Sequence, residues 1–295
     1  MDGDIAASGP GHSATVVEPL TPVGPAEPGH EPHRWFTTNR VGVSSAFIAS
    51  ADFNAHPARL RIHGTRESAL GLFRLLDTVA SLEEASDIFR HFMSLRFGLQ
   101  AQPDPSAPRR WRASYLRLLQ GWGFDANGPE GAVLKGWVES RFGLVPRFHG
   151  EPLARFPSPA WVRYIEQKMG SRFHNNTIDQ QLDLLYEFCQ WVVRRFGLPA
   201  RGWVPVWRGV DAAQLAGTTA LPDGRRLVMF NNLVSFSLSE DRAEPFGACL
   251  LRSELPVQKL LFFPGLLGPS LLAGEGEVMA LGGACWVQVQ KAGAS

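Results

Sequence analysis

Two glutamates lie two residues apart just before an apolar run near the end of the chain, in Gly274-Glu275-Gly276-Glu277-Val278-Met279. Side chains of a β-strand alternate between its two faces, so in an extended stretch Glu275 and Glu277 point the same way. Two carboxylates aimed at one centre can move a proton or stabilise a developing cation. An isolated Glu-x-Glu is more often a pair of solvated charges, so the pair needs support from the rest of the chain.

Two other polar stretches end strand-like runs in the same half of the chain. Arg208-Gly209 follows the run 203–207, and Ser235-Phe236-Ser237 ends the run 233–237. A short helical pattern then begins at Ser239 and continues through Phe246. A strand-end arginine is usually a surface charge and Ser-x-Ser is common, so only the order of the three stretches gives them weight.

Several familiar kinds of site are excluded by what residues 200–295 lack. They contain no histidine, which argues against a Ser-His-Asp or Cys-His site built within this half. The chain has no G-x-x-x-x-G-K-[ST] phosphate loop and no Cys/His cluster with zinc spacing, so we expect no metal. Gly274-x-Gly276 lacks the third glycine of a dinucleotide fingerprint.

Composition points to an ordinary globular protein. The 295 residues are 44% hydrophobic and 19% charged, with a net charge of +1, so no global field favours nucleic acid or a membrane surface. Its three cysteines show no CxxC spacing and fit a reducing compartment. The acidic start lacks a signal-peptide pattern, and the apolar stretch 260–274 is too short to span a bilayer. We therefore expect a cytoplasmic protein.

The chain divides into three parts by pattern. Residues 1–33 are rich in Gly, Pro, Ala and Glu and are expected to form a disordered tail. Residues 34–198 show helical spacing, with Ser81 as an N-cap, and residues 199–291 show strand patterns. Three Arg-Phe-Gly-Leu repeats, at 96–99, 141–144 and 195–198, are interpreted as helix ends closed by a left-handed glycine. The predicted class is α+β, a helical region packed on a mixed β-sandwich.

Several short segments have the pattern of β-strands. Residues 60–63 alternate and suggest a short strand, and separate strands are expected at 227–230, 233–237, 257–263, 278–281 and 286–289.

In this order, Arg208, Ser235-Phe236-Ser237 and Glu275-Gly276-Glu277 resemble the arginine-serine-glutamate motifs of ADP-ribosyltransferases of the cholera-toxin-like class. The middle motif of that class usually reads Ser-Thr-Ser, so Phe236 is a departure. Ala243 and Phe246 match the helix that follows it, and Glu-x-Glu matches members that modify arginine. The resemblance implies an ADP-ribosyltransferase fold and NAD as co-substrate.

The resemblance also implies a role for each matched residue. Arg208 would bind the NAD pyrophosphate through its planar fork, and Gly209 would let the backbone approach the nicotinamide carboxamide. Ser235 would bond the ribose and hold Glu277, with Ser237 and Phe246 completing the NAD contacts. Glu277 would stabilise the oxocarbenium-like cation at ribose C1, and Glu275 would orient the acceptor guanidinium and help remove its proton.

A narrower resemblance extends over residues 34–290. Thr38-Asn39-Arg40-Val41-Gly42, Asn54-x-His56-Pro57, Ile62-x-Gly64-Thr65-Arg66-Glu67 and Pro205-Val206-Trp207-Arg208-Gly209 are similar to the NAD(+)–dinitrogen-reductase ADP-D-ribosyltransferase family. That family modifies one arginine of the nitrogenase iron protein and switches nitrogen fixation off, under regulation by PII signalling proteins. The resemblance implies these two partners, and neither nucleic acid nor a membrane span.

Two alternatives stay open at this point. One is an NAD glycohydrolase that transfers ADP-ribose to water, and the other is an inactive module that binds the iron protein or a PII protein. Both acidic positions are present, which argues against the inactive module. His56 and His63 are interpreted as structural rather than catalytic, and the aromatic helix faces as core.

Overall fold

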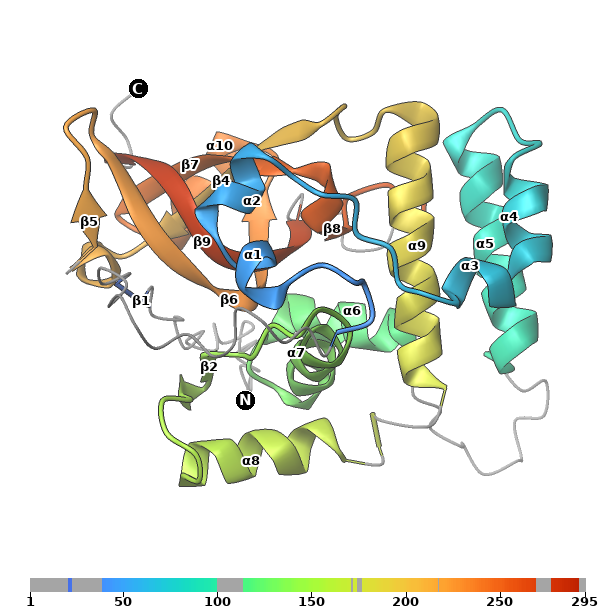
Figure 1. Ribbon diagram of the computed structural model, residues 1–295, viewed down its shortest axis with the longest axis horizontal. Coiled ribbons are helices and arrows are strands. Elements are labelled where there is room, and N and C mark those ends of the chain that lie inside the picture. Colours follow the sequence, from blue (N-terminus) through green and yellow to red (C-terminus); the bar gives the residue numbers. More distant parts are fainter. Residues whose placement is uncertain are drawn as a thin grey trace, which may run out of the picture.

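The computed structural model describes residues 21–22, 39–99, 114–170, 172–173, 177–216, 218–268 and 277–291. Helices come first along the chain and the long strands follow, and the two parts pack side by side (Figure 1). The predicted α+β class is confirmed. One continuous apolar cluster contains residues of both parts, among them Phe89, Phe188, Val234 and Met279, so the helical region and the sheet share a core.

The α-helices have the following bounds: α1 Ser45–Ile48, α2 Ala51–Ala55, α3 Thr65–Ser68, α4 Leu70–Leu76, α5 Leu82–Phe97, α6 Tyr115–Phe124, α7 Pro129–Phe142, α8 Pro159–Lys168, α9 Ile178–Phe196 and α10 Glu240–Ala243. Short 3₁₀ turns are η2 Ala212–Leu215, η3 Glu244–Phe246 and η4 Val257–Lys259. None of the helices in the described part of the chain has the length and apolar character needed to cross a bilayer.

Helix ends follow local sequence signals. The Ser81 hydroxyl accepts a hydrogen bond from the Glu84 backbone N–H at 3.2 Å, as an N-cap does. At the other end of α5, α7 and α9, Gly98, Gly143 and Gly197 take left-handed conformations with φ of 62°, 69° and 69°. A side chain would be strained there, so the Arg-Phe-Gly-Leu repeats are helix terminations, as predicted.

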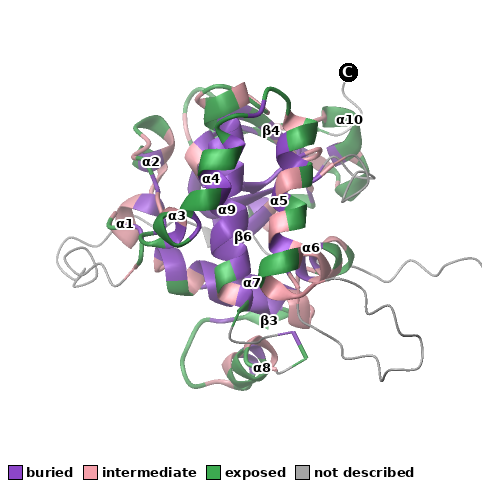
Figure 2. Cartoon of the chain, turned by 90° about the vertical axis from the view of Figure 1, so that its right-hand side faces the viewer, coloured by how far each residue is buried: buried purple, intermediate pink, exposed green. Residues whose placement is uncertain are grey.

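Helix α9 is the centre of the helical region, and Figure 2 shows it buried with other helices around it. Because it is enclosed, its polar side chains need partners inside the protein. Asp183 pairs with Arg141, and Glu187 pairs with Arg66. Gln190 donates to the carbonyls of Val257 and Leu260, which attaches α9 to the sheet.

The strands have the following bounds: β1 Thr21–Pro22, β2 Phe148–His149, β3 Glu151–Pro152, β4 Trp203–Val210, β5 Thr219–Ala220, β6 Arg225–Ser237, β7 Cys249–Pro256, β8 Leu260–Phe262 and β9 Glu277–Lys291. Strands β2 and β3 form a separate hairpin, and the others belong to one sheet. Every pair between these strands is antiparallel, so the sheet is more uniform than the mixed sandwich we expected.

The sheet consists of two long ribbons, β4–β7 and β6–β9, joined at two places. At one junction Cys249–Arg252 of β7 pair with residues 288–291 of β9. At the other, Trp207 of β4 pairs with Ser237 of β6, which also pairs with Glu277 of β9. This second junction brings together segments that are far apart in the sequence.

Several segment predictions were wrong. Residues 60–63 are not a strand, because the Ile62 N–H donates to the Glu187 carboxylate at 2.8 Å instead of to a neighbouring strand. The strands expected at 227–230 and 233–237 are one strand, β6, with a bulge at Asn231 and Asn232. Those expected at 278–281 and 286–289 are likewise one strand, β9.

Two more differences concern the middle of the sheet. The strand expected at 257–263 is a 3₁₀ turn followed by β8. Strand β7 was not predicted from the sequence. Of the tail 1–33, only Thr21 and Pro22 are described, and they pair with Met229 and Val228. The disorder expected there therefore stays a prediction.

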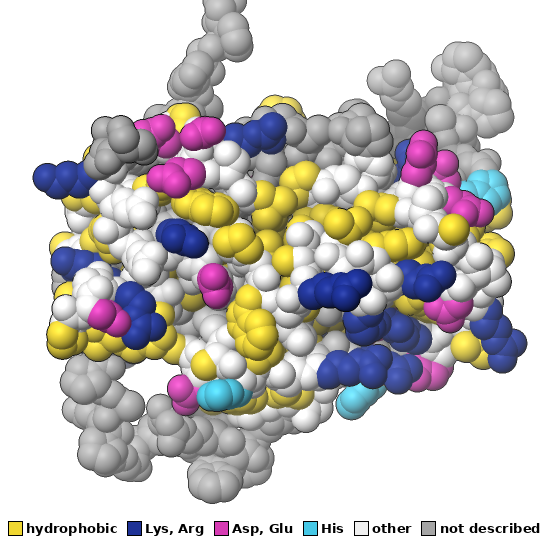
Figure 3. Space-filling model, turned by 90° about the horizontal axis from the view of Figure 1, so that it is seen from above, with side chains coloured by type: hydrophobic (Ala, Val, Ile, Leu, Met, Phe, Trp, Pro, Cys, Tyr) yellow, Lys and Arg dark blue, Asp and Glu magenta, His cyan; other side chains and the backbone are white. Residues whose placement is uncertain are grey.

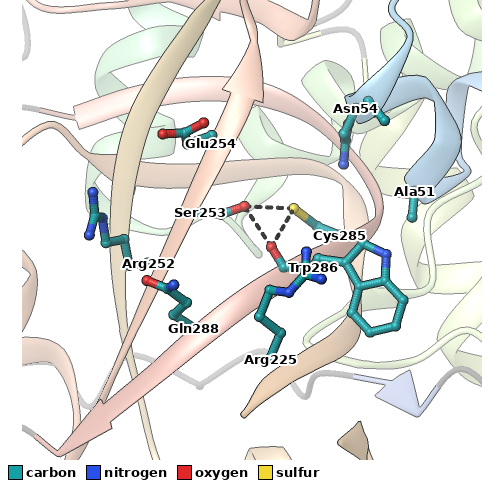
Figure 4. A pocket seen from close by; sticks show the side chains of 10 residues that line it. Ala51, Asn54, Arg225, Arg252, Ser253, Glu254, Cys285, Trp286 and Gln288 are labelled. Carbon is teal, nitrogen blue, oxygen red and sulfur yellow. Dashed lines mark hydrogen bonds between the residues drawn. The ribbon is translucent and has the colours of Figure 1, made fainter. Parts of the chain in front are cut away.

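Beyond Arg252, β7 and β9 diverge, and a cavity of about 320 Å³ lies between them beside α2 (Figure 4). The Ser253 hydroxyl lies 2.9 Å from both the Cys285 sulfur and the Trp286 carbonyl oxygen. Burial raises the pKa of the Cys285 thiol. All three cysteines are free, and Cys285 is a buried packing residue rather than a reactive one.

Candidate active site

A cleft of about 390 Å³ lies at the junction of β4, β6 and β9. Trp207, Ser237 and Glu277 stand opposite one another in register there, so the middle of β4, the end of β6 and the start of β9 form its floor. Helix α10 with η3 forms one wall, and the end of α6 forms another. The lining residues are Trp122, Gly123, Phe124, Ala126, Asn127, Trp207, Arg208, Gly209, Ser235, Phe236, Ser237, Arg242, Ala243, Pro245, Phe246 and Glu277.

The cleft collects six of the seven site residues predicted from the sequence: Arg208, Gly209, Ser235, Ser237, Phe246 and Glu277. The seventh, Glu275, lies outside the described residues, so whether it faces the same way as Glu277 stays a prediction.

Glu277 is 7% exposed and takes part in a compact set of hydrogen bonds. Its Oε1 accepts from the Ser235 hydroxyl and from the indole N–H of Trp122, at 2.9 Å in the second case. The same indole nitrogen lies 2.7 Å from the Ser235 Oγ. Glu277 is therefore held by Ser235, the serine predicted to hold it, and also by Trp122 of the helical region.

Arg208 lies within β4 rather than at its end. Its Nη1 donates to the Ser235 carbonyl oxygen at 2.7 Å, which ties β4 to β6 beside the floor of the cleft. This bond fixes the plane of the guanidinium, and a fixed plane is what bidentate recognition of phosphate oxygens requires.

The serines of the middle motif face the cleft, and Phe236 between them, although it also touches the cleft lining, belongs to the buried core. Phe236 is buried, and its ring packs edge-on against Phe230 with 5.2 Å between ring centroids. Because side chains alternate along a strand, the departure from Ser-Thr-Ser changes a core contact rather than the row of cleft-facing hydroxyls.

Gly209 is required by packing. A Cβ on Gly209 would lie 2.3 Å from the Ala243 carbonyl oxygen, so only glycine lets α10 approach β4 this closely. This contact accounts for the glycine without any ligand, and the approach of nicotinamide to Gly209 stays a proposal. Immediately after α10, Phe246 is 60% exposed at the edge of the cleft, an unusual exposure for a phenylalanine.

The helical region supplies lining residues that the sequence analysis missed. Trp122 belongs to one of the aromatic helix faces that were interpreted as core, and it is indeed only 3% exposed. The one available signal was its indole N–H, which needs an acceptor when buried. Phe124, two residues later, is 88% exposed in the same cleft, and nothing in its sequence context indicated this.

The N-terminal motifs of the narrower resemblance lie outside the cleft and make scaffold contacts. The Asn39 side chain donates to the Val43 carbonyl, and the Arg66 guanidinium pairs with Glu187 of α9. His63 is exposed, and its backbone N–H donates to the Arg40 carbonyl. None of these residues lines the cleft, which fits the structural interpretation of His56 and His63.

A basic surface lies away from the cleft, near the C-terminal end of α9. Lys and Arg side chains gather over that part of the molecule in the view from above (Figure 3). In the last turn of α9, burial first, and then repulsion by Arg66 and Arg59, lowers the pKa of Arg194 to about 10. The net charge of +1 conceals this local concentration.

Comparison with known proteins agrees with the class that the fold and the cleft indicate, an NAD-dependent ADP-ribosyltransferase. Residues 38–289 match the family model described as dinitrogenase reductase ADP-ribosyltransferase. The chain is 47% identical over 254 residues to the NAD(+)--dinitrogen-reductase ADP-D-ribosyltransferase of Rhodospirillum rubrum, covering 84% of this chain and 92% of that protein. No solved structure matches. The chain belongs to the dinitrogenase reductase ADP-ribosyltransferase family.

Proposed function

We propose that this protein transfers ADP-ribose from NAD to an arginine side chain of the nitrogenase iron protein, which inactivates the iron protein. The observation that carries the proposal is the convergence of Arg208, Ser235 and Glu277 on one cleft. Membership in the family supports it, and the acceptor follows from the name of the Rhodospirillum rubrum relative, which specifies dinitrogen reductase.

NAD binding is assigned to one side of the cleft. The guanidinium of Arg208, oriented by the Ser235 carbonyl, binds pyrophosphate oxygens. The exposed ring of Phe246 offers a flat apolar surface against which a planar base can stack. Ser237 lies one pleat beyond Ser235, level with Glu277, and adds a hydroxyl near the ribose.

The reaction breaks the bond between ribose C1 and the nicotinamide nitrogen, and the electron pair leaves with nicotinamide. The remaining ribosyl cation faces the Glu277 carboxylate, which also bonds the ribose 2′-hydroxyl. Because the carboxylate is held before the reaction, it stabilises the cation without having to reorganise. A guanidine nitrogen of the acceptor then bonds to C1, and Glu275 takes the proton that this nitrogen loses.

The proposal also covers the regulator, the cellular location and the co-substrate. A PII signalling protein is the proposed regulator and the cytoplasm the proposed location. NAD is the co-substrate, and no metal takes part in the proposed steps.

Incubation of the protein with labelled NAD and purified iron protein tests the function. The expected result is labelled iron protein, with mass spectrometry locating one ADP-ribose on an arginine. Free ADP-ribose with unlabelled iron protein would identify an NAD glycohydrolase instead. Intact NAD, together with binding of the iron protein or a PII protein, would identify an inactive binding module.

A further inference from the structure

The indole of Trp122 controls the direction of the hydrogen bonds at Glu277. An indole N–H can only donate, so Ser235 Oγ, 2.7 Å away, must accept from it. The single hydroxyl proton of Ser235 is then directed to Glu277 Oε1, which the indole N–H also reaches. Both donors therefore converge on one carboxylate oxygen and fix the rotation of the carboxylate.

Trp122 is itself held firmly by the α6–α7 pair. A Cβ on Gly121 would lie 2.4 Å from the Glu130 side chain, so α6 and α7 are in close contact next to Trp122. On α7, the fully buried Lys135 places its Nζ 5.9 Å from the centre of the Trp122 ring. The same ammonium donates to the Asn127 side chain and to the Phe148 carbonyl, at 3.1 Å and 2.9 Å. These contacts, together with the indole's own hydrogen bonds, hold Trp122 in place.

From this geometry we propose that Trp122 is a positioning residue of the reaction: its indole N–H holds the Glu277 carboxylate and the Ser235 hydroxyl in the orientation that stabilises the ribosyl cation. The inference rests on the proposed function, because it takes Glu277 to be the group facing that cation. It makes the helical region part of the catalytic machinery, since α6 supplies the contact.

Trp191 is a buried tryptophan whose indole hydrogen bond has a purely structural role. Trp191, on α9, donates its indole N–H to the Asp77 carboxylate at 2.8 Å, far from the cleft lining. Trp122 makes the same type of bond, but its acceptor lines the cleft. Trp191→Phe is therefore a matched control, because it removes the same donor from the same kind of pair.

The test compares Trp122→Phe with Trp191→Phe, measuring steady-state nicotinamide release with and without iron protein. Loss of a hydrogen bond to a charged group predicts that Trp122→Phe lowers kcat roughly 10- to 100-fold while KM for NAD changes less than about threefold. Trp191→Phe should keep the wild-type kcat. The melting temperatures of both variants should fall below that of the wild type by similar amounts. Equal kcat values for Trp122→Phe and wild type would overturn the inference.

Two further variants test whether the effect of Trp122 comes from its N–H donor and acts through Glu277. Trp122→His keeps a ring donor and should be faster than Trp122→Phe; equal rates for the two would overturn the inference. In single turnovers, adding Trp122→Phe to Glu277→Gln should cause little further loss, because the carboxylate through which it acts is gone. A further loss as large as in the wild-type background would also overturn it.

These experiments distinguish a failure of the proposed function from a failure of the role proposed for Trp122. A wild-type protein that binds NAD but releases no nicotinamide would remove the proposed function and, with it, this inference. An active wild type with an equally active Trp122→Phe would remove only the role of Trp122.

Discussion

Arg208 donates from Nη1 to the backbone carbonyl oxygen of Ser235, 2.7 Å away, so one predicted NAD contact is oriented by the backbone of another. The two residues lie on β4 and β6 at the junction where these strands meet. Their bond links the shape of the cleft to the direction of the guanidinium. A substitution at Arg208 should therefore affect both the grip on phosphate and the geometry of the motif around it.

Arg208→Lys should raise the Kd for NAD by about tenfold or more, because an ammonium cannot hold the Ser235 carbonyl and also bind phosphate bidentately. Isothermal titration calorimetry with NAD measures the change. Arg163→Lys is the control, since Arg163 is half-exposed on α8 and pairs with Glu151 outside the cleft. An unchanged Kd for Arg208→Lys would remove Arg208 from the NAD site.

Phe246→Ala should raise KM for NAD several-fold, since stacking on an aromatic ring contributes about 1 kcal/mol beyond area burial. The exposed ring makes no core contribution that the substitution could disturb, so the melting temperature should stay close to that of the wild type. Phe156→Ala gives the comparison: Phe156 is 66% exposed and lies just before α8. If both variants have the wild-type KM, Phe246 does not contact NAD.

The features that could be predicted from the sequence are those decided by neighbouring residues. The Ser81 cap and the glycines at 98, 143 and 197 depend on a few positions around a helix end, and the structure has them as predicted. The strand that ends at Ser237 and the strand that starts at Glu277 were found because alternation is also local. Their meeting in one cleft came from resemblance, not from pattern.

The features that could not be predicted depend on distant partners. Trp122 and Glu277 are 155 positions apart, and a tryptophan at core spacing looks the same whether its N–H meets a structural or a catalytic carboxylate. Residues 60–63 alternate like a strand, yet a glutamate from α9 takes the backbone N–H of Ile62. The bulge within β6 also depends on residues distant in the sequence, because the Asn232 side chain donates to the carbonyls of Lys135 in α7 and of Leu144 just after it.

His149 should make the fold sensitive to acid. Burial, as the largest cause, lowers the pKa of His149 to about 4 from its ordinary value of 6.5, although the hydrogen bond with Gln167 opposes this. The unfolded chain therefore binds a proton between pH 6.5 and 4 that the folded chain does not, so stability falls as pH falls through this window. The full effect is ~3 kcal/mol for a shift of this size.

Urea unfolding of the wild type and His149→Phe at several pH values from 7 to 4 tests this sensitivity. The variant should be the less stable protein at pH 7, where it leaves Gln167 without its partner, and the difference should shrink or reverse towards pH 4. His91→Phe serves as the control, because His91 is exposed on α5 and in water both before and after unfolding. A constant difference between wild type and His149→Phe would contradict the assignment.

The two glutamates should separate chemically, because Glu277 is assigned to cleavage of the C1–nicotinamide bond and Glu275 to the incoming guanidinium. Glu277→Gln keeps an acceptor for Trp122 and Ser235 but loses the negative charge, so both transfer and hydrolysis should fall more than a hundredfold, equivalent to ~3 kcal/mol. Glu275→Gln should abolish transfer to arginine and spare most of any slow NAD hydrolysis, since water needs no clamp. Nicotinamide release with and without iron protein measures both, and Glu166→Gln on the exposed face of α8 is the control. Equal loss of hydrolysis in the two variants would show that the division of labour is wrong, and normal activity in both would remove the pair from the site.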